Sequence, residues 1–287
     1  MAKKIKYSQI NSFTPKAFEG NPAGVLIGDE LSDSEMILIA RELNFAETAF
    51  ISSSKNCNYK LRWLTPTTEV DLCGHATIAA LHFLKENGLL MENDEITFET
   101  RSGNLRCGFK KGKYFMEIPI HIVEKFDDDK SIILNALQIK EGIVNSDLPF
   151  LTYNKILFIA INFLSDLNNV SPNFVELKRI STNSLFSTVM LFTLQTNESG
   201  NMAHSRFFAP AEGINEDVVT GSANGPLLLI LKRLNLIDTK SEIIVCTFEQ
   251  GDILKRPGRV TVSYNQNKNE LFIIGDAVTV VRGEFII

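Results

Sequence analysis

The chain has 287 residues, of which 44% are hydrophobic, and its formal net charge at pH 7 is −5. This length fits two domains of ordinary size, and in the absence of a basic stripe we expect no nucleic-acid partner. No apolar run reaches the ~20 residues that span a bilayer and residues 1–6 precede no apolar signal core, so we expect a cytoplasmic protein without a membrane partner.

The first part of the chain alternates predicted strands with one helix. Strand patterns occur at residues 4–13, 22–27 and 59–64, a turn-rich loop at 18–24, and a segment leading into another strand at 44–51. Ser32 and Glu35 have the spacing of a capping box, which predicts a helix to about Leu43. Met36, Ile39, Ala40 and Leu43 are expected to lie on one face of this helix.

The remainder of the chain predicts a second domain. A helix is expected directly after His75. Between residues 119 and 129 the strand pattern gives way to a charged stretch, which indicates a domain boundary. Another helix is predicted to begin within residues 170–173, where a proline follows a plausible cap. We therefore expect one domain over residues 1–118, to which residues 277–287 cross back, and a second over residues 119–276.

Residues 71–77 and 216–223 share one pattern. In each, an acidic residue leads to a glycine, Gly74 or Gly221, then to a histidine or a serine, and an apolar stretch follows. Each pattern predicts a turn that opens a helix. The first turn of a helix offers unpaired N–H groups and partial positive charge. Two such helix starts facing each other would form a site for a carboxylate.

The resemblance between these two segments continues beyond the helices. Gly74 and Gly221 lie 147 positions apart. Each predicted helix is followed by a strand that runs into a glycine, and these glycines, Gly103 and Gly251, lie 148 positions apart. The shared offset indicates two homologous domains rather than a solenoid, which needs at least three stacked units.

The cysteines predict neither a disulfide framework nor a metal site. Cys57, Cys73, Cys107 and Cys246 form no close-spaced pairs of the kind that bind zinc, so we expect free thiols. Cys73 adjoins the first helix start. The other three lie in strand-like apolar runs, where a cysteine is expected to be a small buried hydrophobic residue.

Six motifs, in this order, resemble the phenazine-biosynthesis isomerase (PhzF-like) family across nearly the whole chain. They are Phe18-x-Gly20-Asn21-Pro22-Ala23, Glu47-Thr48-Ala49-Phe50, Thr65-Pro66-x-x-Glu69-Val70-Asp71-Leu72-Cys73-Gly74-His75-Ala76-Thr77, Arg206-x-Phe208-x-Pro210, Gly213-Ile214-x-Glu216-Asp217-x-x-Thr220-Gly221-Ser222-Ala223-x-Gly225-Pro226-Leu227 and Gln250-Gly251. The resemblance implies the diaminopimelate-epimerase-like α+β fold, with two similar domains, each a β-sheet curled around a central helix, and an active site in the cleft between them. It also implies a homodimer and a reaction without a cofactor.

The resemblance makes Glu47 the catalytic acid/base. Moving a proton on carbon beside a carboxylate needs one group that takes the proton and returns it. A carboxyl group removed from water has its pKa raised toward neutral pH, where this exchange is most efficient. Phe45, Ala46 and Phe50 supply apolar neighbours for such a pocket. The alternative is that Glu47 is an exposed residue capping a short turn.

The same resemblance assigns His75 and Asp217 to catalysis, and Gly74, Gly221 and Ser222 to substrate binding. At a helix N-terminus His75 is expected to be a neutral imidazole that donates a hydrogen bond to a developing enolate oxygen. Each side chain also has a structural alternative. His75 is then a hydrogen-bonding residue at a helix start, Asp217 an acid stabilised by the helix dipole, and Ser222 a helix cap.

Three positions depart from the family. Asn224 stands where many members carry a histidine, Val218 replaces a common proline, and Asn201 occupies the region of a frequent aspartate. These differences bear on the identity of the substrate. The sister amino-acid epimerases use one cysteine in each half, but here the second half has Thr220, whose hydroxyl is a poor base. Cys73 is therefore expected to be a packing residue.

Two functions from different classes follow from these observations. The first is an isomerase that moves a proton on a small carboxylate-bearing metabolite, and an intact Glu47 favours it. The second is a catalytically silent protein that binds such a metabolite, and the substitution at Asn224 favours it. Glu69, Asp71 and Glu216 are expected to solvate or brace their loops and not to take part in catalysis.

Overall fold

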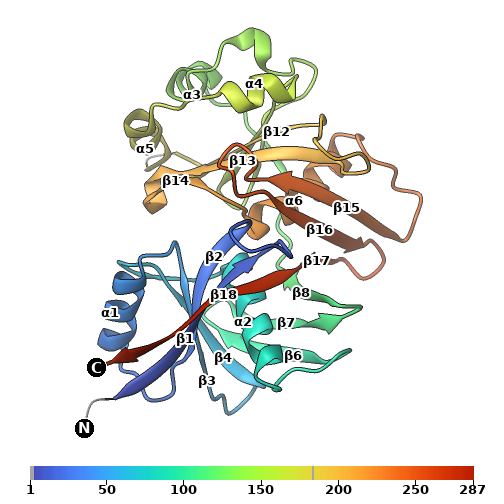
Figure 1. Cartoon of the computed structure of the whole chain (residues 1–287). Helices are drawn as coiled ribbons and strands as arrows, with labels where there is room; N and C mark the ends of the chain where they lie inside the picture. The colour runs from blue at the N-terminus through green and yellow to red at the C-terminus, as the bar shows by residue number, and fades with distance from the viewer. Residues whose placement is uncertain (1–2, 183) are drawn as a thin grey trace. The chain divides into compact units, whose positions relative to one another are not determined.

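The computed structural model describes residues 3–182 and 184–287 (Figure 1). Met1 and Ala2, where the first predicted domain begins, lie outside the described residues. The chain forms two compact units. Unit 1 contains the residues up to Ile118 together with residues 272–287, and unit 2 runs from Pro119 to Leu271.

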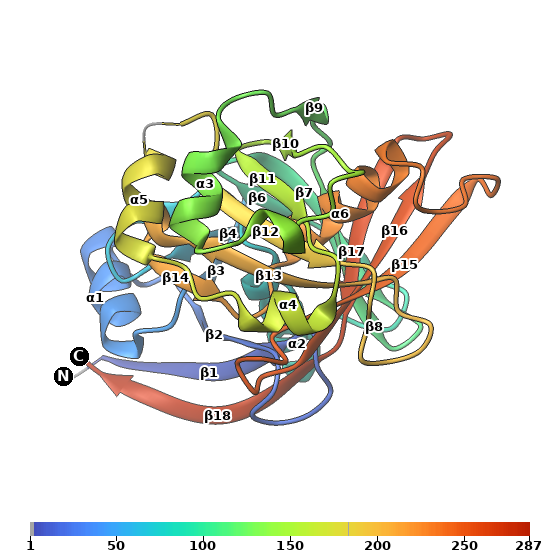
Figure 2. The same cartoon turned by 90° about the horizontal axis from the view of Figure 1, so that it is seen from above.

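Unit 1 consists of strands arranged around one helix, α2. Its strands are β1 (Lys4–Ser12), β2 (Asn21–Ile27), β3 (Thr48–Ser52), β4 (Tyr59–Leu64), β5 (Glu69–Val70), β6 (Glu95–Thr100), β7 (Gly103–Lys110), β8 (Lys113–Ile118) and β18 (Ala277–Ile286), and its helices are α1 (Asp33–Leu43) and α2 (Gly74–Glu86). β1 pairs in antiparallel fashion with β18 and β2, and Figure 2 shows β1 and β18 side by side. β2 and β3 are parallel, and β4 is antiparallel to β3 and parallel to β6.

The helices of unit 1 follow from local sequence. Ser32 caps α1, because its hydroxyl accepts a hydrogen bond from Glu35 N and the Glu35 carboxylate accepts one from Ser32 N at 2.7 Å. The predicted capping box is thus confirmed, and Met36, Ile39 and Ala40 are buried as expected. Helix α2 is apolar around most of its circumference, and ten of its 13 residues are buried. Such a helix is stable only inside a core, which the surrounding strands provide.

Unit 2 repeats this plan and adds helices on the outer face of its sheet. Its strands are β9 (Glu124–Lys125), β10 (Leu151–Tyr153), β11 (Ile156–Ala160), β12 (Thr188–Thr193), β13 (Ala203–Ala209), β14 (Ile214–Asp217), β15 (Ile243–Gln250) and β16 (Gly258–Asn265); its helices are α3 (Lys130–Leu137), α4 (Leu164–Asn169), α5 (Phe174–Thr182) and α6 (Gly221–Arg233), with 3₁₀ turns at Glu141–Ile143 and Pro210–Glu212. β17 (Glu270–Gly275) spans the border of the units. Figure 2 shows α3, α4 and α5 over β11 and β12, where they share one apolar core.

The sequence repeat extends to the strand pairing. In unit 2, β11 and β12 are parallel, and β13 is antiparallel to β12 and parallel to β15, just as β2, β3, β4 and β6 are paired in unit 1. Gly74 and Gly221 each begin a 13-residue helix. Gly103 is the first residue of β7, with φ of +100°, whereas Gly251 directly follows β15, with φ of +88°, and β16 begins only at Gly258. Gly74 and Gly221 therefore occupy matching positions, as the offset predicts, whereas Gly103 and Gly251 lie at different positions after the matching strands β6 and β15.

Several boundaries differ from those predicted. β2 begins at Asn21, inside the expected loop, because Asn21 and Pro22 pair with Ser12 and Asn11 of β1. The helix expected from residues 170–173 begins at Phe174. Its first turn is capped by Asn173, whose side-chain oxygen accepts from Glu176 N at 3.2 Å.

The cysteines are free thiols, as predicted. Cys57 is nevertheless only half-buried and lies in a loop between β3 and β4, not in an apolar strand. Its burial was therefore predicted wrongly, because the neighbouring Tyr59 and Leu61 belong to a strand that begins only after Asn58. Across residues 3–182 and 184–287, no helix combines the length and apolar character needed to cross a membrane.

Candidate active site

Glu47 and His75 meet inside unit 1. Glu47 directly precedes β3, and His75 is the second residue of α2, so the sheet and its central helix hold the two side chains. His75 Nε2 lies 3.4 Å from Glu47 Oε2. The side chains are 4% and 13% exposed, respectively. Glu47 is therefore mostly shielded from water, which excludes the alternative of an exposed turn cap.

The partners of the opposite ring nitrogen define the protonation of His75. Asn21 Nδ2 lies 3.3 Å from His75 Nδ1, and Cys73 Sγ lies 3.5 Å from the same nitrogen. An amide NH₂ group only donates, so Nδ1 accepts, and a neutral imidazole then carries its proton on Nε2. The Nε2 side of the ring lies next to the Glu47 carboxylate, 3.4 Å from Oε2. Ser12 fixes the backbone beneath the ring, because its hydroxyl donates to His75 O at 2.7 Å.

The first turn of α2 is held from within. Cys73 is the N-cap residue, in an extended conformation and without a side-chain capping bond in the described structure. Its carbonyl instead accepts from the Thr77 hydroxyl at 2.6 Å. A cap of this kind leaves the N–H groups at Gly74 without the side-chain acceptor that usually covers them. The site therefore combines a shielded carboxylate, an imidazole N–H and a helix start.

Asp217 braces a turn of unit 2. Its carboxylate accepts from Val218 N at 2.9 Å and from the Thr220 hydroxyl at 2.6 Å, and the residue is 9% exposed. Two acceptor positions of Asp217 thus serve its own turn. Gly221 follows as the first residue of α6.

Ser222 does not cap α6. The N-cap residue is Thr220, and Ser222 is half-buried in the first turn of the helix. The predicted alternative of a capping role for Ser222 is therefore wrong.

A buried amide pair behind this turn was not identified from sequence. Gln250 Oε1 accepts from Thr220 N at 3.0 Å and from Asn224 Nδ2 at 2.6 Å, while Gln250 Nε2 donates to Asp217 O at 3.0 Å. Asn224 also donates to Thr220 O at 3.0 Å, and both amides are fully buried. The available signal was the polar Glu249-Gln250 pair at the end of an otherwise apolar strand. Asn224, noted only as a departure from the family, is one half of the brace.

Two of the acids expected to solvate or brace loops, Glu69 and Glu216, are held in ion pairs, whereas the side chain of the third, Asp71, is 72% exposed beside Arg101. Arg62 of β4 forms a two-pronged ion pair with Glu69 of β5, with bonds of 3.0 and 2.8 Å. These contacts raise the pKa of the Arg62 guanidinium. In unit 2, Arg206 of β13 forms the same fork with Glu216 of β14, with bonds of 2.8 Å each. Both repeats thus contain this two-pronged arginine–glutamate ion pair, which supports a structural role for Glu69 and Glu216.

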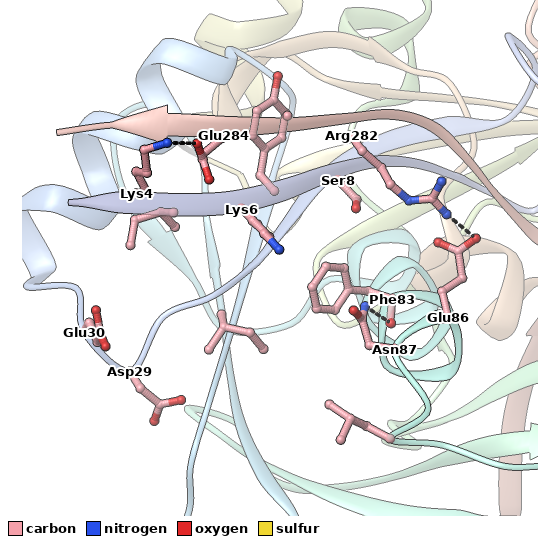
Figure 3. Close-up of a pocket in the computed structure, with 15 residues that line it drawn as sticks. Lys4, Lys6, Ser8, Asp29, Glu30, Phe83, Glu86, Asn87, Arg282 and Glu284 are labelled. Atoms are coloured by element: carbon pink, nitrogen blue, oxygen red, sulfur yellow. Dashed lines mark hydrogen bonds and ion pairs between the residues drawn. The ribbon is translucent and has the colours of Figure 1, made fainter. Parts of the chain in front are cut away.

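A cavity of about 1030 Å³ in unit 1 is separate from these residues (Figure 3). It lies between β1, β18 and the C-terminal end of α2, where Phe83 and Glu86 line it. Ion pairs cross its rim, Lys4 with Glu284 at 3.1 Å and Arg282 with Glu86 at 2.9 Å. Since α2 rises about 1.5 Å per residue, its two ends are about 18 Å apart. This cavity is therefore not the site formed around His75.

Known proteins and structures resemble this chain over nearly its whole length. The profile of the family described as phenazine biosynthesis-like protein matches residues 10–283. An uncharacterized isomerase of Clostridium acetobutylicum is 35% identical, with all of both chains covered. The crystal structure of a Bacillus anthracis phenazine biosynthesis protein of the PhzF family superposes with a TM-score of 0.91 at 28% identity, covering 99% of this chain and 100% of that one.

The chain belongs to the phenazine biosynthesis-like (PhzF-like) family. Its α+β fold is the diaminopimelate-epimerase-like fold, as predicted. A hydroxyproline epimerase from Agrobacterium vitis shares this fold with a TM-score of 0.63 at 11% identity, covering 99% of this chain and 93% of that one. PhzF-like relatives that are named isomerases support an isomerase-type function.

Proposed function

We propose that the chain is a cofactor-independent isomerase that moves a proton on a small carboxylate-bearing metabolite. Glu47 takes the proton from carbon and returns it at another position. The observation that carries this proposal is the 3.4 Å approach of His75 Nε2 to Glu47 Oε2, away from bulk water. A base that also serves as the acid must exchange protons readily in both directions, and a shielded carboxyl group beside an N–H donor meets this requirement.

His75 is the proposed electrophile of the reaction. As carbon loses its proton, negative charge develops on the substrate oxygen, and the Nε2–H group can stabilise that charge without carrying a charge of its own. Asp217 is proposed to orient the substrate. Gly74, Gly221 and Ser222 are proposed to bind its carboxylate through N–H and hydroxyl groups at the helix starts.

Solvent deuterium exchange tests this function. The enzyme is incubated in D₂O with a panel of cyclic and acyclic carboxylates, and deuterium on carbon is followed by NMR. Wild type should label at least one compound. Glu47→Gln should abolish labelling while ligand affinity stays close to wild type, because the amide keeps the shape but has no titratable proton.

Cys73→Ala serves as the contrasting variant. Its exchange rate should remain within a few-fold of wild type, because Glu47 and not the thiol carries the proton. The opposite pattern, with exchange retained in Glu47→Gln and lost in Cys73→Ala, would overturn the proposed mechanism. Binding without exchange by wild type across the whole panel would favour the silent metabolite-binding protein.

A further inference from the structure

Three side chains of unit 1 bring three kinds of metal-ligating atom together. Glu47, Cys73 and His75 each offer one ligand atom, and these atoms all lie within 4.8 Å of one another. Cys73 and His75 are 5% and 4% exposed, so any ion held between them is largely removed from water. A thiolate, an imidazole and a carboxylate together form a ligand set that zinc prefers.

The spacing of the softest pair of ligands already suits such an ion. Zinc binds sulfur at about 2.3 Å and nitrogen at about 2.0–2.1 Å, so a tetrahedral ion holds the two ligand atoms about 3.5 Å apart. Cys73 Sγ lies 3.5 Å from His75 Nδ1. This nitrogen carries a lone pair, since it accepts from Asn21 Nδ2. A cation can replace the amide as the partner of that lone pair.

The carboxylate completes the set and balances the charge. A zinc–oxygen bond is about 2.0–2.2 Å long, so the Glu47 oxygen has to approach the other ligands by about 1 Å. The proposed site requires this movement, because the Glu47 oxygen now lies 3.4 Å from His75 Nε2. On binding, the Cys73 thiol loses its proton to solvent. Thiolate and carboxylate then neutralise the two positive charges of the ion, and a fourth position stays open for water.

We propose that Glu47, Cys73 and His75 bind a divalent cation of the zinc class, and that this binding reversibly stops proton transfer. The second part rests on the proposed function, because the lone pairs that coordinate the ion include those with which Glu47 would take a proton. The ion and the substrate proton thus compete for one carboxylate. Cys73 has a role in this scheme that does not require it to act as a base.

Cobalt titration tests the metal site without any need for turnover. The full-length protein is stripped with a chelator and titrated with Co²⁺, and the thiolate-to-cobalt charge-transfer band is recorded. Wild type should develop this band with about one equivalent of ion. Cys73→Ser should lose it. Cys57→Ser, which removes the half-buried thiol of the same unit, should keep it.

Two further measurements make the outcome decisive. Glu47→Gln should weaken zinc binding, measured by competition with a chromophoric chelator, by at least about tenfold, because an amide is a poorer ligand than a carboxylate. Circular dichroism checks that each variant is folded. A wild-type protein without the band, or a Cys73→Ser variant that retains it, would overturn the metal site.

Inhibition is tested separately. Zinc should slow deuterium exchange by wild type, and a chelator should restore it. If wild type shows the cobalt band but exchanges no compound of the panel, the proposed function fails and the metal site stands. If exchange proceeds and zinc leaves it unchanged, the inhibitory role is excluded.

Discussion

His75 Nε2 faces the Glu47 carboxylate at 3.4 Å, while Asn21 Nδ2 meets the opposite ring nitrogen. The amide thereby selects the tautomer in which the proton lies on the side of the acid/base. Fixing the imidazole in this way matters because a ring free to exchange tautomers would present a donor to Glu47 only part of the time. The Asn21-Pro22 segment of the sequence thus contributes to the site as well as to β2.

The first prediction concerns this donor. His75→Asn should slow deuterium exchange by about 10²–10³-fold, the loss typical for one donor to a developing oxyanion, because the shorter amide no longer reaches the substrate oxygen. The rate is measured by NMR at saturating ligand. His121→Asn changes an exposed histidine of unit 2 and serves as the control with an expected wild-type rate. An unchanged rate in His75→Asn would remove His75 from the mechanism.

The second prediction concerns the brace of unit 2. Gln250→Ala should lower the free energy of unfolding by about 2–4 kcal/mol, because it leaves Thr220 N buried without its acceptor and removes one of the two acceptors of Asn224 Nδ2. Urea unfolding followed by circular dichroism measures the loss. Gln266→Ala also removes two hydrogen bonds, to Thr239 O and Ser241 O, but at the surface. Its cost should stay below about 1 kcal/mol, and equal costs for both variants would contradict the role of the brace.

Local signals were sufficient for elements whose stabilising contacts lie within the element itself. The α1 capping box involves Ser32 and Glu35, three positions apart, and could therefore be read directly. Helix α4 has no such signal. Its last carbonyls, those of Leu167 and Val170, accept from Arg206 of β13 at 2.9 and 2.7 Å. A six-residue helix that depends on a guanidinium distant in sequence cannot be predicted from a local sequence pattern.

The candidate site shows the same division. Glu47 and His75 are 28 positions apart on different elements, and only the family resemblance paired them. The repeat identified the helix starts at Gly74 and Gly221, because similar turns recur at one offset. It did not predict the buried amide of Gln250, because the matching segment of unit 1 gives no sign of one. A sequence repeat predicts only the contacts that both domains share. A contact present in one domain alone cannot be predicted from it.

The third prediction concerns acid stability. Glu249 is fully buried, and burial raises its pKa, but hydrogen bonds from Asn201, Asn197 N, His204 and Glu198 N outweigh that effect and lower the pKa below its usual 4.5. A lowered carboxyl pKa stabilises the folded state above the unfolded value, and this contribution is lost as the pH falls through the folded value. The free energy of unfolding should therefore decline below about pH 4.5.

Substitution of this residue should change both the level and the slope. Glu249→Gln should be less stable than wild type at pH 7, and its stability should fall less steeply between pH 5 and 3, because the titrating group is gone. Urea unfolding over this pH range measures both effects. Arg179 also lowers the pKa of Glu176, but this ion pair is exposed and screened by water, so Glu176→Gln should change the slope less than Glu249→Gln does. If the free energy of unfolding of Glu249→Gln fell more steeply between pH 5 and 3 than that of wild type, the proposed contribution of the Glu249 carboxylate to acid stability would be contradicted.

The last prediction compares Gly103 and Gly251, the two glycines that the sequence offset pairs. Gly103 and Gly251 both have positive φ, +100° and +88°, so an alanine at either position is strained by about 1–2 kcal/mol. In the described part of the chain, no heavy atom lies within 4 Å of a Cβ added at Gly103. A Cβ at Gly251 meets Val218 O at 2.7 Å and the carbonyl of Arg256 more closely still. These are backbone atoms, which cannot move aside without displacing the turn that carries Asp217.

Gly251→Ala should therefore cost about 1–3 kcal/mol more than Gly103→Ala in urea unfolding. Equal costs for the two variants would mean that the turn yields freely, and the close packing behind Asp217 would then not be a constraint on the site.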